Sequence, residues 1–194
     1  MIPKMLLDIT EVKVKLVGLV DIMFDRYAGD NKTQLPVEAL MYFLRDGKTL
    51  CLPALNLQSF LSAKNTTSVS KLVGGKSWGA MADAMLSFVT INPQQIILTR
   101  NGEPIIFNGF SNGYDEQSKI YTHKSVARLK GGIPNPKERP VVELPWEIEF
   151  NLSLMKNSVV DETLLRTAFD KGGMALGLGT FRGVFGKFWV AGWE

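Results

Sequence analysis

The C-terminal quarter of the chain constrains the fold most, because three patterns of different period follow one another there. Apolar and polar residues alternate over residues 146–154, which is the period of a strand with one wet face. Asp161 can then cap a helix that ends at Gly172-Gly173. The aromatic-rich residues 180–190 return as a strand. A strand, a helix, a glycine-rich loop and a strand in this order predict an α+β fold.

Strand patterns and turn signals also occur in the first half of the chain. Residues 11–21 begin with alternating apolar and basic side chains and then become apolar, which predicts a strand that becomes central in a sheet. Residues 25–34 are polar and predict a loop. Asp46-Gly47 and Asn101-Gly102 are dipeptides that favour tight hairpin turns. The strands predicted around these turns are residues 39–45 with 48–52 and residues 96–100 with 103–107.

Two helices are predicted between these hairpins. Pro53 suits a first helical turn, and Leu57, Phe60 and Leu61 recur on one side of a helix that reaches about residue 64. Residues 78–89 predict a second helix. The small and polar residues 65–76 end in two glycines and predict a mobile connection.

Residues 109–140 are loosely patterned and basic, with one predicted strand at 119–129. Six basic residues against three acidic ones give this segment a charge of +3, which equals the net charge of the whole chain (22 basic minus 19 acidic). A segment of this length inside a compact domain is usually functional or poorly ordered. We therefore expect one domain over residues 1–194 with a flexible basic insertion at about 109–140.

The residue inventory excludes several classes of site. With one cysteine, Cys51, and one histidine, His123, an ordinary zinc site of Cys and His is excluded, and we expect no metal and no cofactor. Cys51 reads as a small core residue. The chain has no GxxxxGK[ST] phosphate loop, and a dinucleotide fingerprint fails because Arg182 occupies the third glycine position after Gly177 and Gly179.

The apolar runs are too short to span a bilayer, and the first residues lack the apolar region and cleavage site of a signal peptide. We therefore expect no membrane association and a cytoplasmic location.

The segment 171–190, KGGMALGLGTFRGVFGKFWV, resembles the C-terminal glycine-rich loop of the RAMP superfamily, the RNA-binding proteins of CRISPR effector complexes. Residues 53–61 also look like the junction of strand and first helix in backbone subunits of that family, and the basic insertion stands where those proteins carry a thumb hairpin. The resemblance implies a ferredoxin-like (RRM-like) antiparallel sheet with helices on one face and a thumb-like insertion. The residues that match the loop are Gly177, Gly179, Arg182, Gly183, Gly186, Lys187 and Phe188.

The function that this resemblance implies is the binding of single-stranded RNA or DNA without catalysis. Glycines would let the nucleic-acid backbone approach main-chain N–H groups, while cations neutralise phosphates. The partners would be the nucleic acid and either further copies of the chain, arranged head to tail, or related subunits. The predicted nucleic-acid-binding residues are Gly177, Gly179, Arg182 and Lys187 in the loop, and Lys119, Lys124, Arg128 and Lys130 in the insertion.

Most aromatic side chains of residues 180–190 are expected in the core. In a strand, Phe181, Phe185 and Trp189 would share one face, while Arg182, Val184, Phe188 and Val190 would share the other.

Two alternatives stay open at this point. An endoribonuclease would use His123, whose unperturbed pKa suits acid–base chemistry near neutrality, or an aspartate of the first loop. The resemblance implies the aspartate role for Asp25 or Asp30, because in some RAMP backbone subunits an aspartate in the matching loop takes part in target RNA cleavage. The other alternative is an assembly component that binds no nucleic acid. The sequence leaves open the choice of RNA or DNA, sequence specificity, oligomeric state and pathway.

Overall fold

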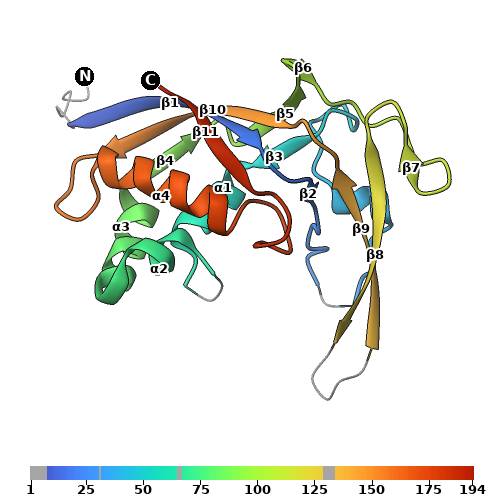
Figure 1. Ribbon diagram of the computed structural model, residues 1–194, viewed down its shortest axis with the longest axis horizontal. Helices are drawn as coiled ribbons and strands as arrows, with labels where there is room; N and C mark the ends of the chain where they lie inside the picture. The colour runs from blue at the N-terminus through green and yellow to red at the C-terminus, as the bar shows by residue number, and fades with distance from the viewer. Residues whose placement is uncertain (1–7, 31, 65–66, 129–133) are drawn as a thin grey trace, which may run out of the picture.

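The computed structural model describes residues 8–30, 32–64, 67–128 and 134–194, and within them it has an α+β architecture with antiparallel sheets (Figure 1). The larger sheet has the strand order β11-β1-β10-β5-β3, with β4 added to β10 and β6 to β5. Every pair in it is antiparallel. Its strands are β1 (Ile9–Gly18), β3 (Cys51–Pro53), β4 (Val89–Asn92), β5 (Gln95–Arg100), β6 (Glu103–Pro104), β10 (Glu147–Met155) and β11 (Phe188–Trp193).

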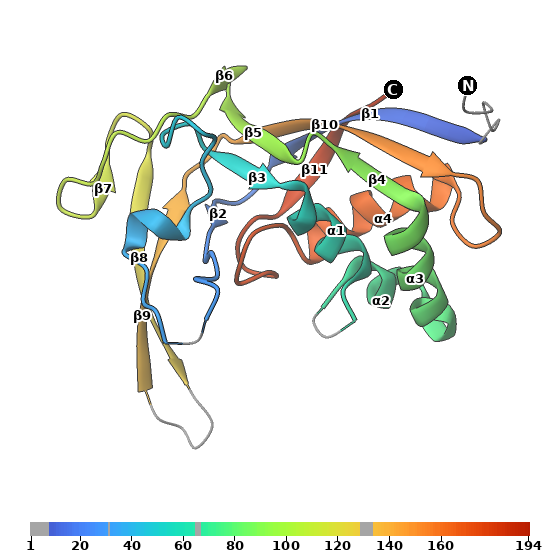
Figure 2. The same cartoon turned by 180° about the vertical axis from the view of Figure 1, so that it is seen from behind.

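Four α-helices lie against one face of this sheet, as Figures 1 and 2 show from opposite sides. Aromatic side chains fill the layer between them: the ring centroids of Phe60 and Phe169 are 5.6 Å apart, as are those of Phe60 and Phe188. The opposite face is polar, with Lys13 paired to Glu149 at 2.7 Å. The predicted α+β class is confirmed. The helices are α1 (Ala54–Ser62), α2 (Val69–Val73), α3 (Trp78–Phe88) and α4 (Glu162–Ala175), with short 3-10 helices at Val37–Leu40 and Gly75–Ser77.

The described part of the basic insertion contains a β hairpin. Strands β8 (Ile120–Arg128) and β9 (Pro134–Val142) pair along all nine residues, with β2 (Ile22–Met23) and β7 (Tyr114–Asp115) completing a second sheet. The hairpin extends away from the larger sheet on the side of the helices (Figures 1 and 2). The strand predicted at 119–129 is confirmed in its described part as β8. The flexibility expected of the insertion stays a prediction.

Strand β9 was missed because it contains Pro134, Pro136 and Pro140, and proline cannot donate to a ladder. The carbonyl of Pro140 accepts from the amide of Phe24 at 3.0 Å, so this residue's backbone groups point away from β8. Pro136 and Pro134 have the same parity along the strand. All three imide nitrogens therefore lie on the edge where no hydrogen bond to β8 is needed.

Three further predictions need correction. Helix α4, capped by Asp161 as expected at 2.7 Å from the Leu164 amide, does not end at Gly172-Gly173 but continues to Ala175. Both glycines instead allow close packing, because a Cβ on Gly172 would lie 2.6 Å from Cζ of Phe60 and one on Gly173 2.5 Å from the Phe188 carbonyl oxygen. A requirement for close packing and a helix stop give the same sequence signal.

The connection predicted over 65–76 contains helix α2 and a 3-10 turn in its described part. Val69 and Ser70 are fully buried there, so tertiary packing overrides a locally polar sequence. The predicted hairpin at Asp46-Gly47 is short: Phe43 and Leu50 form an antiparallel bridge, and the Leu44 amide donates to the Thr49 carbonyl at 2.9 Å. The first residues of its predicted arm, 39 and 40, belong to a 3-10 helix. Strand β3 also pairs with β5, which places the buried Cys51 opposite Ile97 in the core sheet.

The helix predicted at 78–89 and the hairpin at Asn101-Gly102 are confirmed as α3 and as β5–β6, and both turn residues have positive φ. Arg100, at the end of β5, fastens the base of the insertion to the sheet. Its guanidinium donates to the carbonyls of Ser118 (2.5 Å), Glu143 (2.8 Å) and Pro145 (3.0 Å). Burial lowers the pKa of Arg100 from its ordinary value, with Glu143 acting in the opposite direction.

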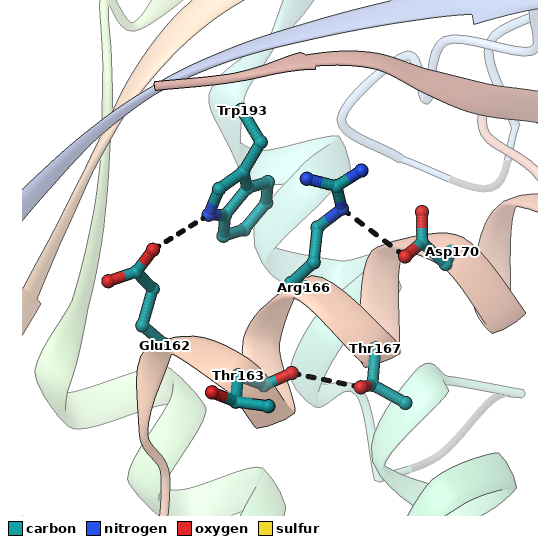
Figure 3. Close-up of polar contacts among 6 residues, drawn as sticks. All are labelled: Glu162, Thr163, Arg166, Thr167, Asp170 and Trp193. Carbon is teal, nitrogen blue, oxygen red and sulfur yellow. Dashed lines mark hydrogen bonds and ion pairs between the residues drawn. The ribbon is translucent and has the colours of Figure 1, made fainter.

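The last strand is tied to α4 by polar and aromatic contacts (Figure 3). The indole N–H of Trp193 donates to Glu162 Oε1 at 3.0 Å, and the guanidinium of Arg166 lies 5.4 Å from the centroid of the Trp193 ring. Arg166 also pairs with Asp170 at 3.2 Å on the next helical turn. These contacts hold α4 and β11 together, and the glycine-rich loop connects these two elements.

Candidate nucleic-acid interface

The glycine-rich loop, residues 176–187, joins α4 to β11 and lies between the helices and the β8–β9 hairpin in both views (Figures 1 and 2). Its amides are bonded mainly within the protein. Thr180 N donates to Met23 O at 2.9 Å, Gly186 N to Asp21 O at 2.7 Å, and Gly183 N to Leu176 O at 2.6 Å. The loop is therefore held by the short segment around β2 as well as by its own ends.

Three glycines of this loop face the protein's own backbone. Gly179 and Gly186 have φ of +75° and +70°, and a Cβ on either would collide with a carbonyl oxygen, that of Met23 or that of Leu178. Gly177 meets the backbone of Gly186 in the same way, whereas a Cβ on Gly183 would meet open space. Glycine was predicted to let a nucleic-acid backbone come close. At three positions the space beside the glycine is occupied by the protein's own backbone. A ligand role for Gly177 and Gly179 stays a prediction.

Arg182 is a half-buried cation that has no carboxylate partner within the described residues. Its guanidinium donates to the carbonyl of Thr67 at 3.2 Å and to Oγ of Ser59 on α1 at 3.3 Å. Burial lowers the pKa of Arg182 from its ordinary value, which records the cost of keeping this charge partly out of water. Neutral partners orient the guanidinium but leave its charge uncompensated.

The strand predicted from residue 180 begins only at Phe188, because residues 180–187 form turns with positive φ at Phe181, Gly183 and Gly186. The predicted two-faced arrangement of side chains is therefore confirmed within β11, where Phe188 and Val190 are buried and Trp189 is exposed, and is wrong for residues 181–185, which form no strand. Phe188 is buried, Trp189 and Phe181 are 48% and 58% exposed, and Phe185 is buried below Phe181 with their ring centroids 6.1 Å apart. Lys187 forms no ion pair with any described residue.

One face of the hairpin packs on the glycine-rich loop. The ladder places His123 opposite Arg139 and Ser125 opposite Lys137, so these four side chains share a face with Tyr121. The His123 ring meets Phe185 edge to face with 5.5 Å between centroids. Tyr121 packs with Met23, Val141 and Phe185, and its hydroxyl donates to Asp21 Oδ2 at 3.3 Å.

Of the four predicted cations of the insertion, Lys119 and Lys124 have described side chains, and they belong to different parts of the hairpin. Lys124 lies on the opposite face of the hairpin, paired with Glu138 at 3.1 Å. Lys119 lies in the turn before β8, with φ of +52°. Arg128 is placed by its backbone at the end of β8, and Lys130 lies outside the described residues. The cations on the face toward the loop are instead Arg139 and the exposed Lys137, which entered the sequence argument only through the charge count.

The three candidate catalytic residues make no direct contact with one another that the structure shows, although Asp25 and Asp30 line the same cleft. Asp25 pairs with Arg139 at 2.7 Å, and Arg139 is the cross-strand neighbour of His123. Asp30 accepts from the amides of Lys32 (2.6 Å) and Thr33 (2.7 Å) and from the Thr33 hydroxyl, and these bonds lower the pKa of its carboxyl. Both aspartates therefore have structural partners.

A polar cleft of about 700 Å³ separates the first loop from β9. Asp25, Asp30 and Lys137 line it, together with Arg26 and Glu138, so charges of both signs face this space. Tyr27, 64% exposed, also belongs to its wall.

The described residues contain no cluster of three or more His, Cys, Asp or Glu suited to a metal ion. Within the same residues, no helix is long and apolar enough to cross a membrane.

The sequence matches no protein-family model and no curated protein. The structure is similar to a chain from a cryo-EM structure of the type III-B Cmr-beta bound to cognate target RNA, with a TM-score of 0.60 at 12% identity. The match covers 96% of this chain and 60% of that one, so the present chain spans less than two thirds of its structural neighbour. At this identity the likeness shows the fold alone.

Proposed function

We propose that this chain is a non-catalytic RAMP-like module that binds single-stranded RNA as a subunit of a CRISPR-like effector complex. The observation that carries the proposal is Arg182: a half-buried guanidinium without a carboxylate partner among the described residues, on a loop between the helices and a long hairpin. An oriented but uncompensated cation is suited to a phosphate, because the protein has already met part of the cost of desolvation and ordering.

The strand order supports a ferredoxin-like core. β1, α1, β4, β10, α4 and β11 follow one another in the chain, and their strands lie in the order β11-β1-β10-β4. Numbered along the chain, this is 4-1-3-2, with every adjacent pair antiparallel, which is the βαββαβ arrangement of that class. The fold likeness to a chain of an RNA-bound complex favours RNA over DNA.

The hairpin supplies the second set of cations. Lys137 is exposed and forms no ion pair with any described residue, while Arg139 is compensated by Asp25. We therefore expect Lys137 and Arg182, rather than Lys124, to contribute most to phosphate binding. Neutralising phosphates with such side chains makes the affinity depend on salt.

The test is the fluorescence anisotropy of labelled single-stranded RNA and DNA oligomers with the purified chain at two salt concentrations. We expect binding that weakens with salt, and a double variant Arg182→Gln, Lys137→Gln that lowers both the affinity and the salt slope. The double variant Lys13→Gln, Lys15→Gln, on the opposite face of the larger sheet, is the matched control for the loss of two positive charges. Absence of binding to either polymer at low salt would refute the proposal and leave the assembly role to pursue.

The non-catalytic part of the proposal has a separate test. Labelled RNA incubated with the chain, with and without divalent cations, should stay intact. Cleavage that disappears in His123→Ala, Asp25→Asn or Asp30→Asn would replace the binding module with an endoribonuclease.

A further inference from the structure

The geometry points to Phe181 as a base-stacking residue, on which one unpaired nucleobase of the bound strand lies. This inference rests on the proposed function and names a contact within it. An aromatic face supports any base, since every base has a π-face.

Phe181 is exposed at a position where burial would be expected of its residue type. Its side chain is 58% accessible, although Phe185 and Phe188 in the same segment are at most 9% accessible. Val184, 54% accessible, is a second exposed apolar side chain of the loop. Scattered exposed apolar residues are ordinary, so exposure alone decides nothing.

The backbone of Phe181 makes the exposure significant. Its φ is +54°, in the left-handed region that bulky side chains rarely adopt, within a loop where glycine occupies the other positive-φ positions. A glycine there would remove the strain and the exposed ring together. A strained residue whose side chain contributes little to the core is a candidate for a ligand contact.

The ring is supported from below. Phe185 lies 6.1 Å from it with the planes 32° apart, and Phe185 is held in turn by His123 of the hairpin. The following residue, Arg182, is fixed by Ser59 and Thr67. A ring with one protected and one open face, next in the chain to an oriented cation, can receive a base together with its phosphate.

The experiment compares four variants of the full chain by RNA anisotropy and by thermal unfolding. Phe181→Leu should lower the affinity for single-stranded RNA by roughly tenfold with an unchanged salt slope, and Phe181→Trp should retain it. Phe181→Gly should lower the affinity at least as much and yet raise the melting temperature, because the strain is relieved. Arg182→Gln serves as the contrast, since it should reduce the salt slope.

A single 2-aminopurine in the oligomer gives an independent readout. Its fluorescence should be quenched by the wild-type chain at one or a few positions and recover with Phe181→Leu. Wild-type affinity in Phe181→Leu while Arg182→Gln loses affinity would overturn the stacking role but leave the binding function standing. A lower melting temperature in Phe181→Gly would assign the ring to the fold and overturn the inference. If the wild-type chain binds no RNA, the proposed function itself falls.

Discussion

The glycine-rich loop and the β8–β9 hairpin were singled out by the same criterion, cations beside unusual composition, but the structure builds them in opposite ways. The loop is fastened to β2 and to its own ends through its amides, and its cation Arg182 is half-buried. The hairpin is a regular ladder on which Lys124 and Lys137 are exposed, whereas Arg139 pairs with Asp25. The loop therefore holds its side chains in a fixed geometry, whereas the hairpin carries exposed charged side chains away from the larger sheet.

The two regions meet at one place, where Phe185 of the loop contacts His123 and Tyr121 of the hairpin. Asp21 fastens this junction from below, because its carbonyl accepts from Gly186 and its carboxylate accepts from Tyr121 and from the Leu144 amide. This contact would couple the glycine-rich loop to the hairpin. If the two regions differ as described, substitutions in the loop should affect stability more than substitutions in the hairpin.

Truncation of a core aromatic next to the loop should be costly, whereas truncation on the hairpin should not. Phe188 is fully buried against Phe60, so Phe188→Ala should lower the free energy of unfolding by about 3–5 kcal/mol. Val126 is 63% exposed on the hairpin, and Val126→Ala should change it by less than about 0.5 kcal/mol. Urea unfolding of both variants provides the measurement. Comparable losses would mean that the hairpin is part of the cooperative core.

Glycines within the loop should differ among themselves. Gly186→Ala places a Cβ on the Leu178 carbonyl and should destabilise by roughly 2–4 kcal/mol, since it combines a collision with an unfavourable φ. Gly183→Ala has open space and should cost only about 1 kcal/mol, from its φ of +90°. Thermal unfolding of the pair distinguishes packing from conformation. Equal costs would show that the loop yields to the added methyl group.

The two cations should separate stability from binding. Arg182→Met removes hydrogen bonds to Ser59 and Thr67 and should lower the free energy of unfolding by about 1 kcal/mol. Lys137→Met should leave stability within about 0.5 kcal/mol. Both should weaken RNA binding in the anisotropy assay. A stability loss without any binding loss in Arg182→Met would make that residue a purely structural link between the loop and α1.

Sequence patterns identified the elements whose signals are local and misread those decided by distant contacts. Asn101-Gly102 requires two positive φ angles at adjacent residues, and Asp161 caps its own helix, so both could be found from a few neighbouring residues. Gly172 was read as a helix stop because a local pattern cannot reveal that Phe60 packs against it. Strand β9 was missed because prolines are compatible with a strand only where their nitrogens face away from the paired strand. Which edge of β9 faces β8 cannot be seen in the sequence.

The candidate site divides in the same way. Arg182 and Lys187 could be chosen from charge and spacing, since a lone cation in a glycine-rich loop is visible in the sequence. The contact of His123 with Phe185 joins residues far apart in the chain, and Lys137 gains its position only from the register of the hairpin. Phe181 carried one signal that was not used: it stands in Gly-Thr-Phe-Arg-Gly, where a turn is more expected than a strand.

The smallest expected effect is on the loss of stability at acidic pH. Asp46, in the turn that precedes β3, accepts hydrogen bonds from the Thr49 hydroxyl and from the amides of Lys48 and Thr49, both at 2.9 Å. These hydrogen bonds lower the pKa of the Asp46 carboxyl. Similar hydrogen bonds lower the pKa of Asp30, in the loop beside the hairpin. A carboxyl whose pKa is lowered in the folded state stabilises the fold when the pH is above 3.8, its ordinary pKa. This stabilisation is lost as the pH falls through the folded-state pKa. Thr49 is buried and belongs to the core side, so Asp46→Asn should remove more of the acid sensitivity of unfolding below about pH 4 than Asp30→Asn does. The measurement is the urea concentration at the midpoint of unfolding, at pH 3 and pH 7, for both variants. If Asp30→Asn changes the difference between the two midpoints more than Asp46→Asn does, the first loop and the hairpin that faces it unfold cooperatively with the core.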